Sequence, residues 1–346
     1  MDFVPAHVTA SDSGVSVVVP AHNAMPEVLD TVASALAQSP APLEVLVVDD
    51  RSTDGTVSAL RERFGDRVRL LSGAYGSAAA ARNAGWRAAR GAFVAFLDAD
   101  DLWFAGKLAA ALDAFARQPE AAWFFSDGEY EDRDGALHAS WLAVYADMPG
   151  DYVGSPVGEL IDVNFVLTSS VVVRRDALVA AGGFDESLTN GEDIDLWIRL
   201  SRAAPAVGSP RPLVRYRHRP GSLSSRVEAR LEGTREVCAR LAADRALAPG
   251  LRARARRRAS LCALKLAWSA LRAGDGRAAR ARLRGAWGVP ARVLPVAAMF
   301  AASFLPAPAI AALRARRTGH AVAAPALSVG RVTLTSQPAG ATGHAR

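Results

Sequence analysis

The sequence predicts an α/β fold, a mostly parallel sheet flanked by helices, followed by an α-helical C-terminal extension. Two patterns predict it. Strand and helix signals alternate along the first hundred residues, and near residue 226 the composition changes to Ala, Arg and Leu with helical spacing. A repeated strand–helix–strand order favours a parallel, doubly wound sheet. Half of the 346 residues are hydrophobic, so the chain can bury a substantial core.

The predicted strands of the first half are apolar runs, and the helices between them have helically spaced apolar residues. The run over 15–19 is β-branched and ends at Pro20, and Pro26 starts the next helix. A turn and cap cluster over 52–55 precedes another helix. In order, we expect a strand over 15–19, a helix over 27–38, a strand over 43–48, a helix over 56–64, a strand over 68–71, a helix over 77–90 and a strand over 93–97.

The pattern is mixed after residue 101. We expect helices over 107–117, 176–181 and 192–202, strands over 122–125, 169–173 and 213–217, and a loop-rich segment over 130–158. From residue 227 we expect three packed helices, over 227–245, 252–273 and 277–286. The predicted organisation is therefore an N-terminal tail over 1–14, an α/β domain over 15–225, a basic helical extension over 226–320 and a disordered tail over 321–346.

The charge is distributed unevenly. Residues 1–225 hold 19 Lys and Arg against 30 Asp and Glu, a net charge of −11, whereas residues 226–346 hold 22 against 5, a net charge of +17. A basic C-terminal part suggests an anionic partner, either anionic lipid or nucleic acid. No aromatic residues of the kind that stack bases are interleaved with the arginines, so nucleic acid is not expected. The alternative is that the arginines form solvated helix faces.

Residues 293–313 carry no charge and are flanked by arginines. Their length matches a membrane span, but three prolines and many alanines favour an interfacial or re-entrant segment at an anionic membrane surface. The alternative is a buried helical hairpin. The N-terminus lacks the basic flank and apolar core of a signal peptide, and Cys238 and Cys262 fit buried thiols in a reducing compartment. We therefore expect a cytoplasmic protein, at or near the inner face of the membrane.

Polar clusters follow several predicted strands. Asp98, Asp100 and Asp101 come directly after the strand over 93–97, and Asp49-Asp50 ends the strand over 43–48. The carboxyl ends of parallel strands meet at one edge of a sheet, where ligands bind. Clustered carboxylates repel one another unless a cation neutralises them, and a divalent metal holding a diphosphate meets that need. The chain has no glycine-rich dinucleotide fingerprint and no P-loop, so metal is expected to hold the phosphates.

Six pieces of the sequence together resemble the family 2 glycosyltransferases of the GT-A fold. In order they read SVVVPAHNA, VVDDRSTDGT, ARNAG, FLDADDLW, GGFDESL and NGEDIDLWIRL. They extend over about residues 15–225 and leave the basic C-terminal part uncovered. The resemblance implies transfer of a sugar from a UDP-, dTDP- or GDP-sugar to a hydroxyl acceptor, with inversion and with Mn²⁺ or Mg²⁺. The acceptor would be a saccharide or a lipid-linked saccharide of the cell surface.

The resemblance also implies roles on the nucleotide side. Pro20 and His22 would line the base pocket with Asn23 beside them, and His22 stands where many relatives have Tyr. Asp50 would hydrogen-bond the base, the alternative being a helix cap. Arg51 replaces a glycine common in relatives, which makes the local turn geometry a point to check.

Around the diphosphate, Arg82 would face the phosphates, the alternative being a solvated helix face. Asp98 would contact the ribose or the donor sugar, and Asp100 would bind the metal. Asp101 either orients the site or caps the following turn. His218 would return to the metal or the diphosphate, the alternative being a structural histidine.

On the acceptor side, Asp193 would be the general base, because inverting transfer needs a carboxylate next to the acceptor hydroxyl. Glu192 would position acceptor or donor, and Asp195 would face elsewhere on the helix. Trp197 would be a platform for a sugar ring, the alternative being core packing.

The sequence leaves three alternatives open. The same sheet could belong to a retaining transferase, to a nucleotidyltransferase or to a non-catalytic module that binds a sugar nucleotide. The chain lacks the Q-x-x-R-W motif of polymerising relatives, which favours transfer of single sugars.

Overall fold

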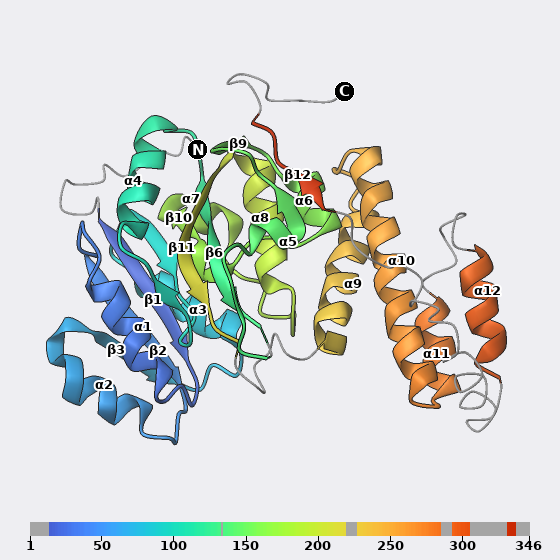
Figure 1. Ribbon diagram of the computed structural model, residues 1–346, viewed down its shortest axis with the longest axis horizontal. Coiled ribbons are helices and arrows are strands. Elements are labelled where there is room, and N and C mark those ends of the chain that lie inside the picture. The colour runs from blue at the N-terminus through green and yellow to red at the C-terminus, as the bar shows by residue number, and fades with distance from the viewer. Residues whose placement is uncertain (1–13, 133, 219–226, 285–292, 305–330, 337–346) are drawn as a thin grey trace, which may run out of the picture.

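A computed structural model describes residues 14–132, 134–218, 227–284, 293–304 and 331–336 (Figure 1). Its centre is a ten-stranded sheet with helices on both faces, and the C-terminal helices stand together at one side of the sheet. Along the sheet the strand order is β3-β2-β1-β4-β10-β6-β11-β5, with β7 paired to β6 and β9 paired to β11. The α/β fold class with a helical C-terminal region is therefore confirmed.

The strands run over Val15–Ala21 (β1), Glu44–Asp50 (β2), Arg69–Gly73 (β3), Phe93–Phe96 (β4), Leu102–Trp103 (β5), Trp123–Glu131 (β6), Leu137–His138 (β7), Ala146–Asp147 (β8), Tyr152–Gly154 (β9), Val172–Arg174 (β10), Ala206–Tyr216 (β11) and Val332–Thr333 (β12). The helices run over Glu27–Leu36 (α1), Thr56–Phe64 (α2), Ala78–Ala88 (α3), Lys107–Arg117 (α4), Leu142–Tyr145 (α5), Val157–Asp162 (α6), Arg175–Ala181 (α7), Glu192–Ala203 (α8), Val227–Ala243 (α9), Pro249–Arg272 (α10), Gly276–Leu283 (α11) and Val293–Ala302 (α12). Short 3₁₀ turns cover Gly65–Arg67 and Thr168–Ser170.

The sheet is parallel except for one internal strand and its short edge strands. β1 pairs in parallel with β2 and β4, β2 with β3, and β6 with β11. β10 lies between β4 and β6 and runs antiparallel to both. The strands β1, β2, β4, β6 and β11 therefore all point the same way, and their carboxyl ends share one edge of the sheet.

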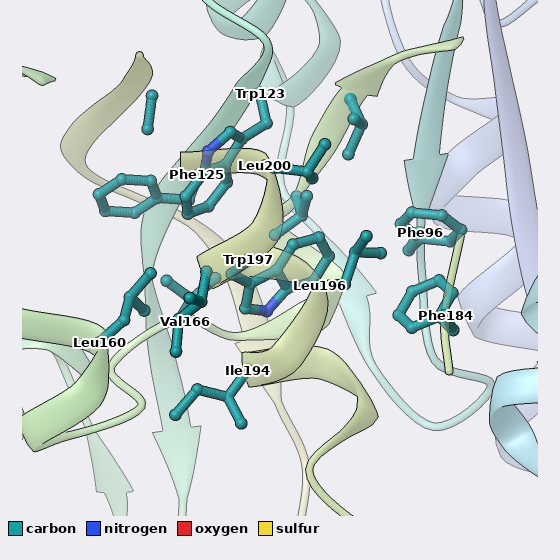
Figure 2. Packing of buried hydrophobic residues seen from close by; sticks show 14 of the residues in the cluster. Phe96, Trp123, Phe125, Leu160, Val166, Phe184, Ile194, Leu196, Trp197 and Leu200 are labelled. Atoms are coloured by element: carbon teal, nitrogen blue, oxygen red, sulfur yellow. The ribbon is translucent and has the colours of Figure 1, made fainter. Parts of the chain in front are cut away.

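The two faces of the sheet are covered by different helices. Along β1, Val17 and Val19 face a core shared with α1, α2 and α4, whereas Val18 faces a core shared with α3, α6 and α8. The alternation follows from the two-residue period of a strand. Figure 2 shows the second core, where aromatic residues of β4, β6 and α8 pack together.

The helical C-terminal region packs onto the sheet region through ion pairs and buried apolar side chains. Arg254 of α10 lies 2.8 Å from Asp162 of α6, and Arg240 of α9 lies 2.7 Å from Asp185. Val237 of α9 is 1% exposed within the core shared with α8. The first three predicted helices of this region are confirmed as α9, α10 and α11. Cys238 and Cys262 are buried free thiols, as expected.

The uncharged segment is only partly described. α12 covers its first ten residues, and residues 305–313 lie outside the described ranges. Among the described residues, no helix is both long and apolar enough to cross a membrane. Whether the segment is interfacial or a buried hairpin stays a prediction.

The tail prediction is wrong for residues 331–336. Val332 and Thr333 pair in parallel with β8, and Leu334 is 2% exposed. The pattern Val-Thr-Leu alternates apolar and polar residues, which suits a short half-buried strand. The remainder of 321–346 lies outside the described ranges.

Candidate active site

Asp50 ends β2 with its side chain held by backbone N–H groups. The backbone nitrogens of Tyr75 and Gly76 each donate to one of its two carboxylate oxygens at 2.8 Å, and Arg51 Nε donates at 3.1 Å. Burial opposes the charge, but these donors outweigh it and lower the pKa of Asp50. Asp50 is therefore kept ionised, with its carboxylate at the carboxyl edge of the sheet.

The end of β1 is tied to the loop after β2. His22 Nδ1 donates to the Asp50 carbonyl oxygen at 2.6 Å, so the imidazole is positioned at the end of the strand. The Asn23 side chain accepts from the Thr53 nitrogen at 2.8 Å. Arg51 adopts the left-handed backbone conformation with φ +57°, as a glycine would there, so the turn forms despite the replacement. Pro20 pairs with Val48 just before this loop.

One buried arginine connects the two sides of the site. Arg82, on α3, donates from Nη2 to Asp98 at 2.6 Å and from Nη1 to Glu192 at 3.0 Å. Burial opposes its charge, but the two carboxylates outweigh burial and raise the pKa of Arg82. The side chain is only 7% exposed, so the alternative of a solvated helix face does not hold.

Asp101 is buried behind this bridge rather than open to a ligand. Ser169 Oγ donates to one of its oxygens, and the Arg217 backbone nitrogen donates to the other at 3.1 Å. Ser169 Oγ also accepts from the Asp98 nitrogen at 3.0 Å. Burial, then the charges of Asp100 and Asp98, raise the pKa of Asp101 well above its ordinary value. Asp101 is therefore tied to Ser169 and to the residue that follows β11, and its role in the site stays a prediction.

Arg217 also brings the end of β11 against the acidic segment. Its Nε donates to the Asp100 carbonyl oxygen, so His218 follows directly after a residue bonded to this segment. Among the described residues, the buried His218 Nε2 has no hydrogen-bond partner. An unpaired imidazole nitrogen is a usual metal ligand, so His218 fits the expected use.

Asp193 lies at the start of α8, in the next position after Glu192. Asn164 Nδ2 donates to Asp193 Oδ2 at 2.8 Å, and the Ile194 nitrogen donates to Oδ1 at 2.7 Å. Burial raises the pKa of Asp193 above its ordinary value even though these donors and Arg82 lower it. Burial and the neighbouring Asp193 also raise the pKa of Glu192. Asp195 instead pairs with Arg199 at 2.6 Å, on another face of α8.

The prediction that Trp197 contacts a sugar ring is wrong. Trp197 is 0% exposed and stacks on Trp123 with ring centroids 5.5 Å apart. Phe184 approaches its ring edge-on at 6.0 Å, and Figure 2 shows Trp197 enclosed by these aromatic rings. One helical turn after Asp193, its side chain points to the core that anchors α8, so core packing, the alternative, is what the structure has.

Two residues that hold the site were missed from the sequence. Asn164 supports Asp193, and Ser169 supports both Asp98 and Asp101. Asn164 lies in the connection after α6 and Ser169 in the short 3₁₀ turn over Thr168–Ser170, where a lone Asn or Ser carries no periodic signal. Asp132 instead lies in a surface turn, where its carboxylate accepts from the Asp134 and Ala136 nitrogens.

Known proteins resemble this chain both in sequence and in fold. Residues 16–174 match the model of Glycosyl transferase family 2. The chain is 34% identical over 236 residues to the O-antigen biosynthesis protein RfbC of Myxococcus xanthus, which covers 64% of this chain and 18% of that protein. The chain therefore spans less than a fifth of the length of that relative.

Two solved structures share the fold. The S. aureus TarS fragment 1-349 in complex with UDP-GlcNAc superposes with a TM-score of 0.61 at 18% identity, covering 88% of this chain and 92% of that one. The mannosyltransferase PcManGT from Pyrobaculum calidifontis in complex with GDP-Man and Mn²⁺ has a TM-score of 0.56 at 22% identity, covering 88% and 82%. At these identities the likeness establishes the GT-A type fold.

Proposed function

Because residues 16–174 of this chain belong to glycosyl transferase family 2, we propose that it transfers a sugar from a nucleotide diphosphate sugar to an acceptor hydroxyl with inversion. One observation carries the proposal. The buried Arg82 bridges Asp98, at the end of β4, to Glu192, next to the partly buried Asp193. A donor-side carboxylate is thus joined, through Arg82, to the residue that directly precedes the candidate base.

The nucleotide side is assigned to the edge formed by β1, β2 and β4. Asp50, kept ionised by the Tyr75 and Gly76 nitrogens, has lone pairs left to accept from a base N–H. His22, Asn23 and Pro20 surround the same edge. TarS and PcManGT were solved with UDP-GlcNAc and GDP-Man, which supports a nucleotide-sugar donor.

Asp193 is assigned as the general base. As the acceptor oxygen forms its bond to the anomeric carbon, the bond from that carbon to the diphosphate breaks and the hydroxyl proton passes to Asp193. A base works best with a pKa near the working pH, and burial moves the pKa of Asp193 in that direction. The hydrogen bonds from Asn164 to Oδ2 and from the Ile194 nitrogen to Oδ1 hold the carboxylate of Asp193 in one orientation.

Asp100 and His218 would hold a divalent cation, Mn²⁺ or Mg²⁺. Among the described residues, no group of three acidic, His or Cys side chains could hold a metal, which suits a site completed by donor phosphates and water. Such a cation, when bound, stabilises negative charge on the leaving diphosphate. PcManGT was solved with Mn²⁺, which supports this assignment.

The acceptor is proposed to be a growing cell-surface polysaccharide or a lipid-linked saccharide at the inner face of the membrane. The name of RfbC supports a cell-surface polysaccharide as the acceptor. The location at the membrane rests on the charge of +17 over 226–346 and on exposed side chains such as Phe304, which is 63% exposed. Retention at vesicles containing anionic lipid, but not at neutral ones, would test the membrane part.

The stereochemical outcome tests the central proposal. The protein is incubated with a panel of nucleotide sugars and Mn²⁺, and proton NMR follows the anomeric configuration of the first sugar released or transferred. We expect the configuration opposite to that of the donor. Retained configuration would favour a retaining transferase, and absence of any donor turnover would favour a binding module. Conversion of the donor to a sugar 1-phosphate and a nucleoside triphosphate, seen only when pyrophosphate is added, would favour a nucleotidyltransferase.

A further inference from the structure

Two glycines bring α9 into direct backbone contact with the loop just before Glu192 and Asp193. A Cβ atom on Gly233 of α9 would lie 2.2 Å from the Asn190 carbonyl oxygen and 2.5 Å from its carbon. A Cβ atom on Gly191 would lie 3.2 Å from the Gly233 carbonyl carbon and 3.4 Å from Val237 Cγ2. Each backbone therefore occupies the space that a side chain on the other would need.

The loop at this contact has little freedom of its own. Gly191 precedes α8 with φ +83°, a conformation that other residues adopt only with strain. Its carbonyl oxygen accepts the first hydrogen bond of α8, from the Asp195 nitrogen at 3.1 Å. The position of Gly191 thus sets where α8 starts, and the first turn of α8 carries both carboxylates of the acceptor side.

The surrounding contacts attach α9 firmly to the same region. Arg240 of α9 pairs with Asp185 at 2.7 Å, and Asp244, just after α9, pairs with Arg202 at the end of α8 at 2.7 Å. Val237 and Leu241 are buried in the core that includes Ile194. A displacement of α9 is therefore passed on to α8 rather than absorbed between them.

We infer that Gly233 is a positioning residue: its contact with Asn190 and Gly191 fixes the start of α8, so that the helical C-terminal region is part of the acceptor side of the active site. This inference rests on the proposed role of Asp193. It assigns the helical region a part in catalysis itself, in addition to any contact with a membrane. The sugar-transfer step depends on the register between α9 and the loop over 190–191.

The test substitutes glycines in the full-length chain. Gly233→Ala adds a methyl group against backbone atoms that cannot rotate away, so α9 or the loop must move by about 1 Å, a displacement that can lower kcat by about 10- to 100-fold. Nucleotide affinity, measured by calorimetry, is expected to remain unchanged. Hydrogen exchange of the Asp195 amide is expected to accelerate, and the acidic limb of the pH–rate profile to move to lower pH as Asp193 becomes more solvated.

Two matched controls separate positioning from general destabilisation. A Cβ atom on Gly276 of α11 would lie 2.0 Å from the Ser303 carbonyl oxygen, an equally tight contact remote from the site, and one on Gly250 of α10 would meet nothing. Gly276→Ala and Gly250→Ala should keep the kcat and the Asp195 exchange rate of the wild type. Equal losses in Gly233→Ala and Gly276→Ala, or a wild-type kcat in Gly233→Ala, would overturn the inference.

A second pair of variants covers the case in which Gly233→Ala does not fold. Val237→Ala loosens the same contact, and Val296→Ala removes the same atoms from a fully buried position in α12. A several-fold lower kcat in Val237→Ala alone supports the inference, and equal values contradict it. If the wild-type protein transfers no sugar, the proposed function fails, whereas exchange at Asp195 still decides whether Gly233 positions α8.

Discussion

Asp50 and Asp193 are both carboxylates withdrawn from solvent in the same site, but their surroundings move their pKa values in opposite directions. Burial opposes ionisation at both. At Asp50, two backbone N–H groups and Arg51 outweigh it and lower the pKa. At Asp193, burial wins over its hydrogen bonds and raises the pKa. With the proposed assignment, the nucleotide side has a carboxylate kept as an anion, and the acceptor side has one that takes up a proton more readily.

The largest effect is expected from a substitution that changes the acceptor side alone. In Asp193→Asn the amide cannot take a proton from the acceptor, so sugar transfer should fall by about 10²- to 10⁴-fold. Nucleotide binding, measured by calorimetry, should stay as in the wild type because Asp50 and Asp98 are untouched. Asp132→Asn, in the surface turn, is the control and should transfer normally. Full activity in Asp193→Asn would contradict the assignment of the base.

Removing the bridge should damage both sides together. Arg82→Met leaves Asp98 and Glu192 without their shared partner, which should lower the free energy of unfolding by about 3 kcal/mol. Urea denaturation measures this change. The control is Arg87→Met, which breaks an exposed pair with Glu186 and should cost no more than about 1 kcal/mol. Equal costs in the two variants would mean that Arg82 does not join the two sides.

A smaller effect, on nucleotide affinity rather than on kcat, is expected from a substitution on the nucleotide side. In Asp50→Asn, the new NH2 group faces either the Tyr75 or the Gly76 nitrogen, which is also a donor, so the loop that carries this nitrogen must shift. Nucleotide affinity should fall about tenfold, equivalent to about 1.4 kcal/mol. The kcat at saturating donor should change little. A loss of kcat with normal affinity, the pattern expected for Asp193→Asn, would show that the two sides are not separable.

The pH dependence should separate the two sides without any substitution. As pH falls, Asp193 is protonated first because its folded pKa is raised above 3.8, whereas Asp50 stays ionised because its pKa is lowered below 3.8. Between the two pKa values the protein should bind donor and fail to transfer. Calorimetry and initial rates at matched pH measure both. Parallel loss of binding and transfer would contradict the comparison.

The ionisation of Asp50 also affects the free energy of unfolding. The lowered pKa of Asp50 means that its hydrogen bonds stabilise the fold above the unfolded pKa, and this contribution is lost as pH falls through the folded value.

Much of the fold could be predicted because its signals are local. Apolar runs located β1, β2 and β4, and helical spacing located α2 and α4 to the residue. The direction of β10 could not be predicted, because an apolar run of a few residues reads the same in either direction and its partners are distant in the chain. β12 was missed because its pairing with β8 joins segments nearly two hundred residues apart.

The residues of the candidate site also fall into those that could be predicted from the sequence and those that could not. Aspartates after strands are visible in the sequence, and Asp50 and Asp98 lie at the ends of β2 and β4. Asp193 lies in the first turn of a predicted helix, and the roles of all three stay predictions. Trp197 was misjudged because residues i and i+4 share a helix face, so the spacing from Asp193 does not tell whether that face meets a ligand or the core at Trp197. Asn164 and Ser169 could not be found, since their importance lies only in which side chains they meet after folding.

The reversed strand β10 has a consequence for how such an enzyme can diversify. β10 lies between the strands that carry the residues assigned to the nucleotide and the strands that lead to the acceptor side. Ser169, three residues before β10, accepts from the Asp98 nitrogen, on the nucleotide side. Side chains on either side can be replaced without changing the backbone pairing of β10 with β4 and β6. We therefore expect donor and acceptor preferences to change separately, as long as the Arg82 bridge between the two sides is kept.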